Sequence, residues 1–67
     1  MSPAQALAMR IKLLREQRGM TQEELAARAG ISRGYLARLE TARQDPRLST
    51  IEKLAKALKV KAAELLG

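Results

Sequence analysis

Cysteine and histidine are absent from this chain of 67 residues, and Tyr35 is its only aromatic residue. Without thiols or imidazoles, the chain lacks the commonest zinc ligands and the usual catalytic base near neutral pH. It also has no glycine-rich phosphate loop, and its carboxylates fall at helix starts or on exposed faces. We therefore expect a protein that is not an enzyme and that holds no metal or cofactor.

Long apolar runs are missing as well. No stretch approaches the roughly 18 apolar residues of a membrane span, and residues 1–10 lack the uninterrupted apolar segment of a signal peptide. These absences predict a cytoplasmic protein with no membrane partner. The apolar residues, 46% of the chain, are mostly leucine, alanine and isoleucine, a composition that favours helices over strands. At this length we expect one compact all-α domain spanning residues 1–67.

Acidic residues are scarce, since seven Asp and Glu face thirteen Lys and Arg and leave a net charge of +6. Such an excess indicates a polyanionic partner, with nucleic acid first among the candidates. A solvated basic surface that only aids solubility would have the same composition. Charge alone does not separate these two alternatives.

Five helices are predicted from apolar periodicity and from the residues that begin and end helices. Leu7, Ile11 and Leu14 repeat at i, i+4 and i+7, which places them on one helical face. Thr21 and Ser49 each begin a capping-box pattern, in which a Glu follows three residues later. The expected helices are residues 3–18, 22–29, 33–41, 50–58 and 62–66.

The second and third helices are joined by a short turn, in the segment from Thr21 to Thr41. Gly30 marks the sharp turn between them, because glycine adopts positive φ without steric cost. Ser32 is a favoured N-cap for the third helix, and Leu36 and Leu39 give that helix its buried side.

This segment resembles the helix-turn-helix of phage repressors, Cro proteins and related bacterial regulators of the XRE type. The likeness includes Gln22 at the start of the second helix, small Ala26 where two helices approach closely, Gly30 in the turn and apolar Ile31 after it. It extends from about residue 7 to residue 66. The resemblance implies a compact five-helix repressor-like fold and a transcriptional regulator that binds double-stranded DNA.

The outward face of the third helix is the expected base-reading surface, because a B-form major groove admits one α-helix. Arg33 is the first candidate, since its planar fork can donate two hydrogen bonds to guanine, and Arg38 is the second. Ala37 could touch a thymine methyl, and the resemblance adds Ser32 and Gly34. The alternatives are a solvated surface arginine at position 33 and a salt-bridged one at position 38.

Phosphate contacts are expected around this face. The N-terminus of the second helix favours an anion beside Thr21 and Gln22. The resemblance turns Tyr35 toward the DNA backbone, where a phenol can donate to phosphate, while the alternative is an aromatic that fills the small core. The loop after the third helix supplies the remaining expected phosphate contacts: Thr41, Arg43, Gln44 and Arg47. The alternative is a disordered basic loop.

We expect structural roles for Gly30 in the turn and for Arg15 and Glu40. The resemblance implies that these last two form an internal ion pair, as in some relatives, which would tie the first helix to the end of the third. The chain departs from the family pattern at three helix ends where glycine or a polar cap is usual: Ala42, Lys59 and Lys61.

The expected assembly is a homodimer that places two recognition helices in successive major grooves, about 34 Å apart, on an approximately palindromic operator. Leu13, Leu65 and Leu66 are the interface candidates, and core packing is the alternative for each. A second hypothesis is an antitoxin or bridging factor. Its main partner would be a protein, such as a toxin or the transcription machinery, and its DNA binding would be autoregulatory.

Overall fold

The computed structural model describes residues 1–67, which form five helices and no strand. This confirms the all-α architecture that the sequence predicts. No helix combines the length and the apolar character needed to span a membrane. In chain order the helices are α1 (Pro3–Gln17), α2 (Gln22–Ala29), α3 (Arg33–Glu40), α4 (Leu48–Leu58) and α5 (Ala62–Leu66).

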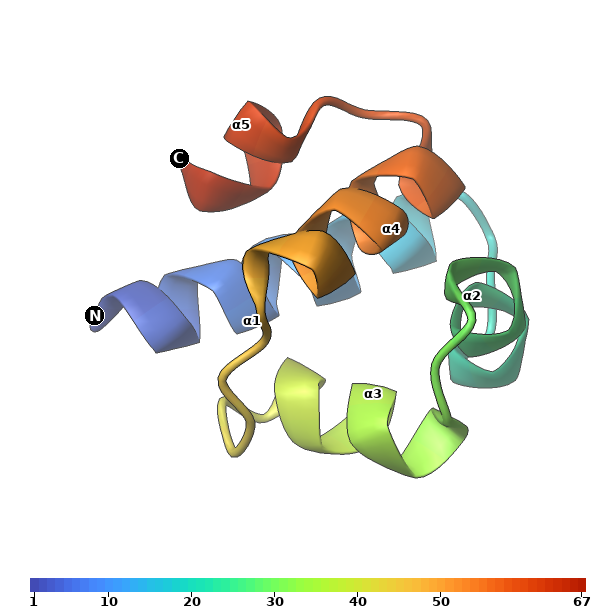
Figure 1. Ribbon diagram of the computed structural model, residues 1–67, viewed down its shortest axis with the longest axis horizontal. Helices are drawn as coiled ribbons and strands as arrows, with labels where there is room; N and C mark the ends of the chain where they lie inside the picture. Colours follow the sequence, from blue (N-terminus) through green and yellow to red (C-terminus); the bar gives the residue numbers. More distant parts are fainter.

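Helix α4 lies at the centre of the molecule, with α1 behind it, α5 above, α2 to the right and α3 below in Figure 1. It packs against α1, α2 and α5, whereas α3 packs against α1 and α2. Because α3 and α4 are held by the same neighbours and hardly touch each other, a groove stays open between them.

The core lies among all five helices. Each large apolar side chain that is withdrawn from water stabilises the fold by about 1.5–3 kcal/mol. The large side chains that are almost completely buried are Ile11, Leu25, Leu36, Leu39, Leu54, Leu58 and Leu65.

The presence of Leu65 in this core corrects one prediction. Its side chain is 0% exposed within a single chain, so it cannot contact a second copy. The short helix α5 lies against α1 and α4, and this packing consumes Leu65, while Leu66 turns outward. The sequence shows two adjacent leucines at the C-terminal end and does not reveal which of them faces the core.

The starts of α2 and α3 follow the capping chemistry predicted from the sequence. The hydroxyl of Thr21 accepts a hydrogen bond from the Glu24 N–H at 3.0 Å, and the Glu24 carboxylate accepts from the Thr21 N–H at 2.9 Å. The Ser32 hydroxyl accepts from the Tyr35 N–H at 3.0 Å. Both helices of the helix-turn-helix are therefore fixed at their N-termini by local contacts.

The start of α4 does not follow the prediction. The helix begins at Leu48, two residues before the expected Thr50, so the capping box predicted at Ser49 is wrong. Arg47 is the N-cap and makes no side-chain cap bond, while its carbonyl accepts from the amides of Thr50 and Ile51. A side-chain cap contributes only about 1 kcal/mol, so the path of the preceding loop can override it.

Two of the departures from the family pattern lie where the backbone is left-handed. Ala42 has a φ of 60° after α3, and Lys59 has a φ of 59° at the end of α4. A side chain with a Cβ costs about 1–2 kcal/mol in this conformation, which explains why glycine is favoured there. The side chain of Lys61 has no acceptor for the free N–H groups at the start of α5. Its own backbone N–H donates to the Glu64 carboxylate at 2.7 Å, and this bond stabilises the first turn of the helix.

Candidate nucleic-acid interface

Helix α3 presents most of its expected base-reading residues to solvent. Ser32, Arg33, Gly34 and Arg38 are exposed, whereas Ala37 is half-buried. The hydroxyl oxygen of Ser32 is used as the N-cap acceptor, which leaves its O–H free to donate outward. The exposed face of α3 therefore carries hydrogen-bond donors at its start and in its last turn.

Arg33 lies at the first position of α3, close to the start of α2. Its Nε is 3.9 Å from the Glu23 carboxylate, and both side chains are largely exposed. Exposed ion pairs of this length contribute little to stability. The Arg33 guanidinium is consequently free to exchange Glu23 for another acceptor.

Arg38 is held more closely than Arg33. Its Nε donates to the side-chain oxygen of Gln44 at 3.3 Å. One turn earlier, a Cβ built on Gly34 would lie 3.6 Å from Arg38 Nη1, so the guanidinium rests over the bare backbone of that glycine. The structure thus brings Gly34, Arg38 and Gln44 together.

The N-terminus of α2 has fewer free groups than the sequence indicates. The N–H of Thr21 donates to the Glu24 carboxylate, and its hydroxyl oxygen accepts from the Glu24 N–H. The hydrogen bond from the Thr21 N–H first, and the Thr21 side chain second, lower the pKa of Glu24 below its ordinary value of 4.5. Gln22 donates through its side chain to Glu40 at 3.0 Å. The backbone N–H groups of Gln22 and Glu23 have no acceptor within the protein and remain for an anion.

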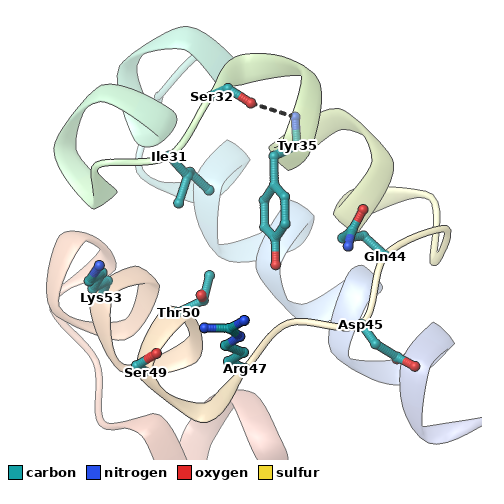
Figure 2. A pocket seen from close by; sticks show the side chains of 9 residues that line it. All are labelled: Ile31, Ser32, Tyr35, Gln44, Asp45, Arg47, Ser49, Thr50 and Lys53. Atoms are coloured by element: carbon teal, nitrogen blue, oxygen red, sulfur yellow. Dashed lines mark hydrogen bonds between the residues drawn. The ribbon is translucent and has the colours of Figure 1, made fainter.

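A groove of about 510 Å³ lies between α3 and the start of α4 (Figure 2). The ring of Tyr35 packs against the core, and its phenol oxygen points across the groove toward Arg47 and Thr50. The ring of Tyr35 is thus partly buried while its hydroxyl lies in the groove, and a contact of this hydroxyl with phosphate stays a prediction. The lining residues are Ile31, Ser32, Tyr35, Gln44, Asp45, Arg47, Ser49, Thr50 and Lys53.

Five of the lining residues were not among the predicted contacts: Ile31 in the turn, Asp45 in the loop, and Ser49, Thr50 and Lys53 on α4. Ser49 and Thr50 carry the pattern of a helix cap, and Lys53 is one of many lysines, so the sequence gives no signal that they face Tyr35. They reach the groove because the first turns of α4 lie opposite α3.

The other two predicted phosphate residues of the loop lie outside this groove. The Thr41 hydroxyl donates to the carbonyls of Arg38 at 3.0 Å and Ala37 at 3.2 Å. This predicted phosphate donor is therefore engaged in ending α3. Arg43 is exposed and forms no ion pair, and its backbone N–H donates to the Arg38 carbonyl at 2.8 Å.

A buried ion pair joins α1 to the end of α3. Arg15 on α1 forms a two-pronged contact with Glu40 at the end of α3, with Nε–Oε2 at 2.7 Å and Nη2–Oε1 at 3.1 Å. The hydrogen bond to Glu40 holds the pKa of Arg15 above its ordinary value. Arg15 also donates to the Met20 carbonyl at 2.7 Å, and Gln22 completes the network from α2. Three helices are thus joined at one carboxylate.

Apolar side chains remain exposed on the faces considered for dimerisation. Leu13 is 51% exposed and Leu66 is 53% exposed. Met9 lies one turn before Leu13 on α1 and is also exposed, which extends the apolar surface to a residue that the sequence analysis did not select.

The sequence of this chain is similar to those of known helix-turn-helix proteins. Residues 11–65 match the model of the family HTH_3, described as helix-turn-helix. The immunity repressor protein of Bacillus phage phi105 is 43% identical over 61 residues, which make up 91% of this chain but only 42% of the phage protein. This chain therefore spans less than half the length of that repressor.

The fold of this chain is also similar to those of solved regulator structures. The crystal structure of the hypothetical transcription factor NHTF from Neisseria has a TM-score of 0.95 at 41% identity, covering 98% of this chain and 76% of that chain. The master regulator for biofilm formation SinR, solved in complex with DNA, has a TM-score of 0.87 at 34% identity, covering 91% of this chain and 98% of that chain.

Proposed function

This chain belongs to the HTH_3 helix-turn-helix family, and from that membership we propose that it is a transcriptional regulator acting in the cytoplasm, with α3 in the major groove of double-stranded DNA. The family comprises regulators and not enzymes, in agreement with the sequence prediction. The observation that carries the proposal is the division of α3 into two faces. Leu36 and Leu39 are buried, while Arg33 and Arg38 are exposed on a helix held by both α1 and α2.

Base reading is assigned to the two arginines. A guanidinium can donate to O6 and N7 of one guanine, and each such pair discriminates against other bases by about 1–3 kcal/mol. Arg33 and Arg38 stand five residues apart, so they would meet different base pairs. Ser32, Gly34 and Ala37 would then set how closely α3 approaches the bases.

Phosphate binding is assigned to two places on either side of α3. The free amides at the start of α2 form one, where the helix dipole favours an anion. The groove between α3 and α4 forms the other, with the Tyr35 phenol and the cations Arg47 and Lys53 along one channel. Arg43 extends this basic surface beyond the groove.

The assembly we propose is a homodimer on an approximately palindromic operator. Two arginines specify few base pairs, and a second copy doubles the number that is read. Leu13 and Leu66 are the interface candidates, because both are exposed and apolar.

Selection of bound duplexes from random DNA tests the function. We expect an enriched motif with two symmetric half-sites whose centres are separated by about one helical turn, 10–10.5 base pairs. Arg33→Ala should relax base preference at one position of each half-site, whereas Arg43→Ala should weaken binding to all sequences and lower the salt slope by about one. Failure to enrich any motif would contradict the proposal, and a stoichiometric protein that copurifies and blocks DNA binding would favour the antitoxin alternative.

A further inference from the structure

We propose that Gln44 is a positioning residue that orients Arg38 for base reading and links this arginine to the phosphate groove. The inference rests on the proposed function, because it assigns to Gln44 a part in the specificity of that same site. Sequence reasoning places Gln44 among the phosphate contacts only.

The contact between the two side chains carries the inference. A guanidinium has only donors, so it is the amide oxygen of Gln44 that faces Arg38, 3.3 Å from Nε. With Nε engaged, the two terminal nitrogens Nη1 and Nη2 are left to donate. These two form the end-on fork that matches the O6 and N7 acceptors of guanine.

Gly34 lies on the other side of the arginine and leaves room for it. Nη1 of Arg38 lies 3.6 Å from the position that a Cβ would occupy on Gly34. The guanidinium therefore lies between the bare backbone of α3 at Gly34 and the amide of Gln44, and its hydrogen bond to Gln44 restrains it. An exposed arginine normally samples many rotamers, and ordering it on binding costs conformational entropy. Holding the head group beforehand lowers that cost for the orientation that reads guanine.

Gln44 also lines the groove between α3 and α4, where Figure 2 shows its side-chain amide at the rim beside Tyr35. Its oxygen is used by Arg38, so its NH₂ group is the part that remains for a phosphate. One half-buried side chain thus connects the expected backbone contact to the expected base contact. Docking of the DNA backbone in the groove would fix Gln44, and Gln44 would fix Arg38.

Measured base preferences of single and double variants test this inference. The variants are Gln44→Ala, Arg38→Ala and the double substitution, each bound to the selected operator and to operators changed at the base pair that Arg38 reads. We expect Gln44→Ala to reduce discrimination at that base pair by roughly threefold to tenfold. In the Arg38→Ala background the same change should leave discrimination unaltered.

Gln44→Glu distinguishes orientation from phosphate binding. A carboxylate keeps an acceptor for Arg38 Nε but repels phosphate, so this variant should bind every sequence more weakly while retaining its base preference. Gln17→Ala is the matched control, since Gln17 is an exposed glutamine whose side chain has no hydrogen-bond partner. Thermal unfolding of each variant verifies that the fold is intact.

The outcomes separate this inference from the proposed function. Equal weakening of all operators by Gln44→Ala would make Gln44 a phosphate contact alone and overturn the inference, with DNA recognition by α3 unaffected. Unchanged preference in Arg38→Ala would also overturn it, because there would be no base reader to orient. The absence of any selected motif would overturn the proposed function itself.

Discussion

Glu23 is the acidic side chain closest to the expected base readers, with its carboxylate 3.9 Å from Arg33 Nε. Its own backbone N–H is one of the two free amides at the start of α2, where a phosphate is expected. We predict that Glu23→Gln tightens binding to every DNA sequence by roughly twofold to tenfold at low salt, because a negative charge near the phosphates is removed. The gain should fall as salt is raised.

Glu16→Gln is the control for this measurement. Glu16 is exposed and its carboxylate lies 3.9 Å from the buried Arg15, so the substitution removes the same charge and a contact of the same length. A titration in which both variants gain equally would indicate a general effect of net charge and not a local effect at α3.

Gly34 and Gly30 provide a second prediction at the scale of the residue. Gly34 lies inside a helix where an added Cβ would make only an ordinary contact, so Gly34→Ala should raise the free energy of unfolding by about 0.5–1 kcal/mol. Gly30 has a φ of +70°, and Gly30→Ala should lower the free energy of unfolding by about 1 kcal/mol. Urea denaturation measures both, and equal effects of the two substitutions would contradict the argument.

At the scale of the element, Glu40 joins three helices through Arg15 and Gln22. Glu40→Ala would leave Arg15 buried without its partner, and we predict a loss of about 3 kcal/mol in the free energy of unfolding. The double variant Arg15→Met/Glu40→Leu should be less destabilised than Glu40→Ala, because it buries no uncompensated charge. The single variants Arg15→Met and Glu40→Leu complete a double-mutant cycle, and additive effects in it would show that the pair is not coupled.

The start of α2 makes the stability of that helix dependent on pH. Because the folded-state pKa of Glu24 is lowered, its carboxylate stabilises the fold above its ordinary pKa of 4.5, and this contribution is lost as pH falls through the folded-state pKa. Gln can keep the hydrogen bond to Thr21 without the charge. We therefore predict that the difference in unfolding free energy between the wild type and Glu24→Gln shrinks on acidification, and a constant difference would contradict it.

Local chemistry explains which elements the sequence could predict. The N-terminal caps at Thr21 and Ser32 depend on residues three positions apart, so their pattern is visible in the chain. The start of α4 depends on how a loop returns from α3, and the capping pattern at Ser49 was therefore misleading. Arg38 contacts Gln44 from a different element, and Lys53 of α4 lines the same groove as residues of α3. No spacing in the sequence reveals either arrangement.

At the scale of the whole molecule, the apolar side chains that remain outside the core bear on assembly. We predict that Leu13→Asp or Leu66→Asp lowers dimer affinity and, with it, affinity for a palindromic operator, because a charge would be buried at the interface. Sedimentation at several concentrations measures the first effect. Leu48→Asp is the control for sedimentation, since Leu48 is 61% exposed and is not an interface candidate. A dimer unaltered in the Leu13 and Leu66 variants would exclude both as interface residues.

The scarcity of aromatic residues has a practical consequence. Tyr35 is the only side chain that absorbs and emits in the near ultraviolet as an aromatic, and its phenol lies in the groove between α3 and α4. The intrinsic fluorescence of the entire protein therefore originates from one ring at the proposed phosphate contact. Occupancy of that groove becomes a spectroscopic signal that needs no label and has no background from other aromatic residues.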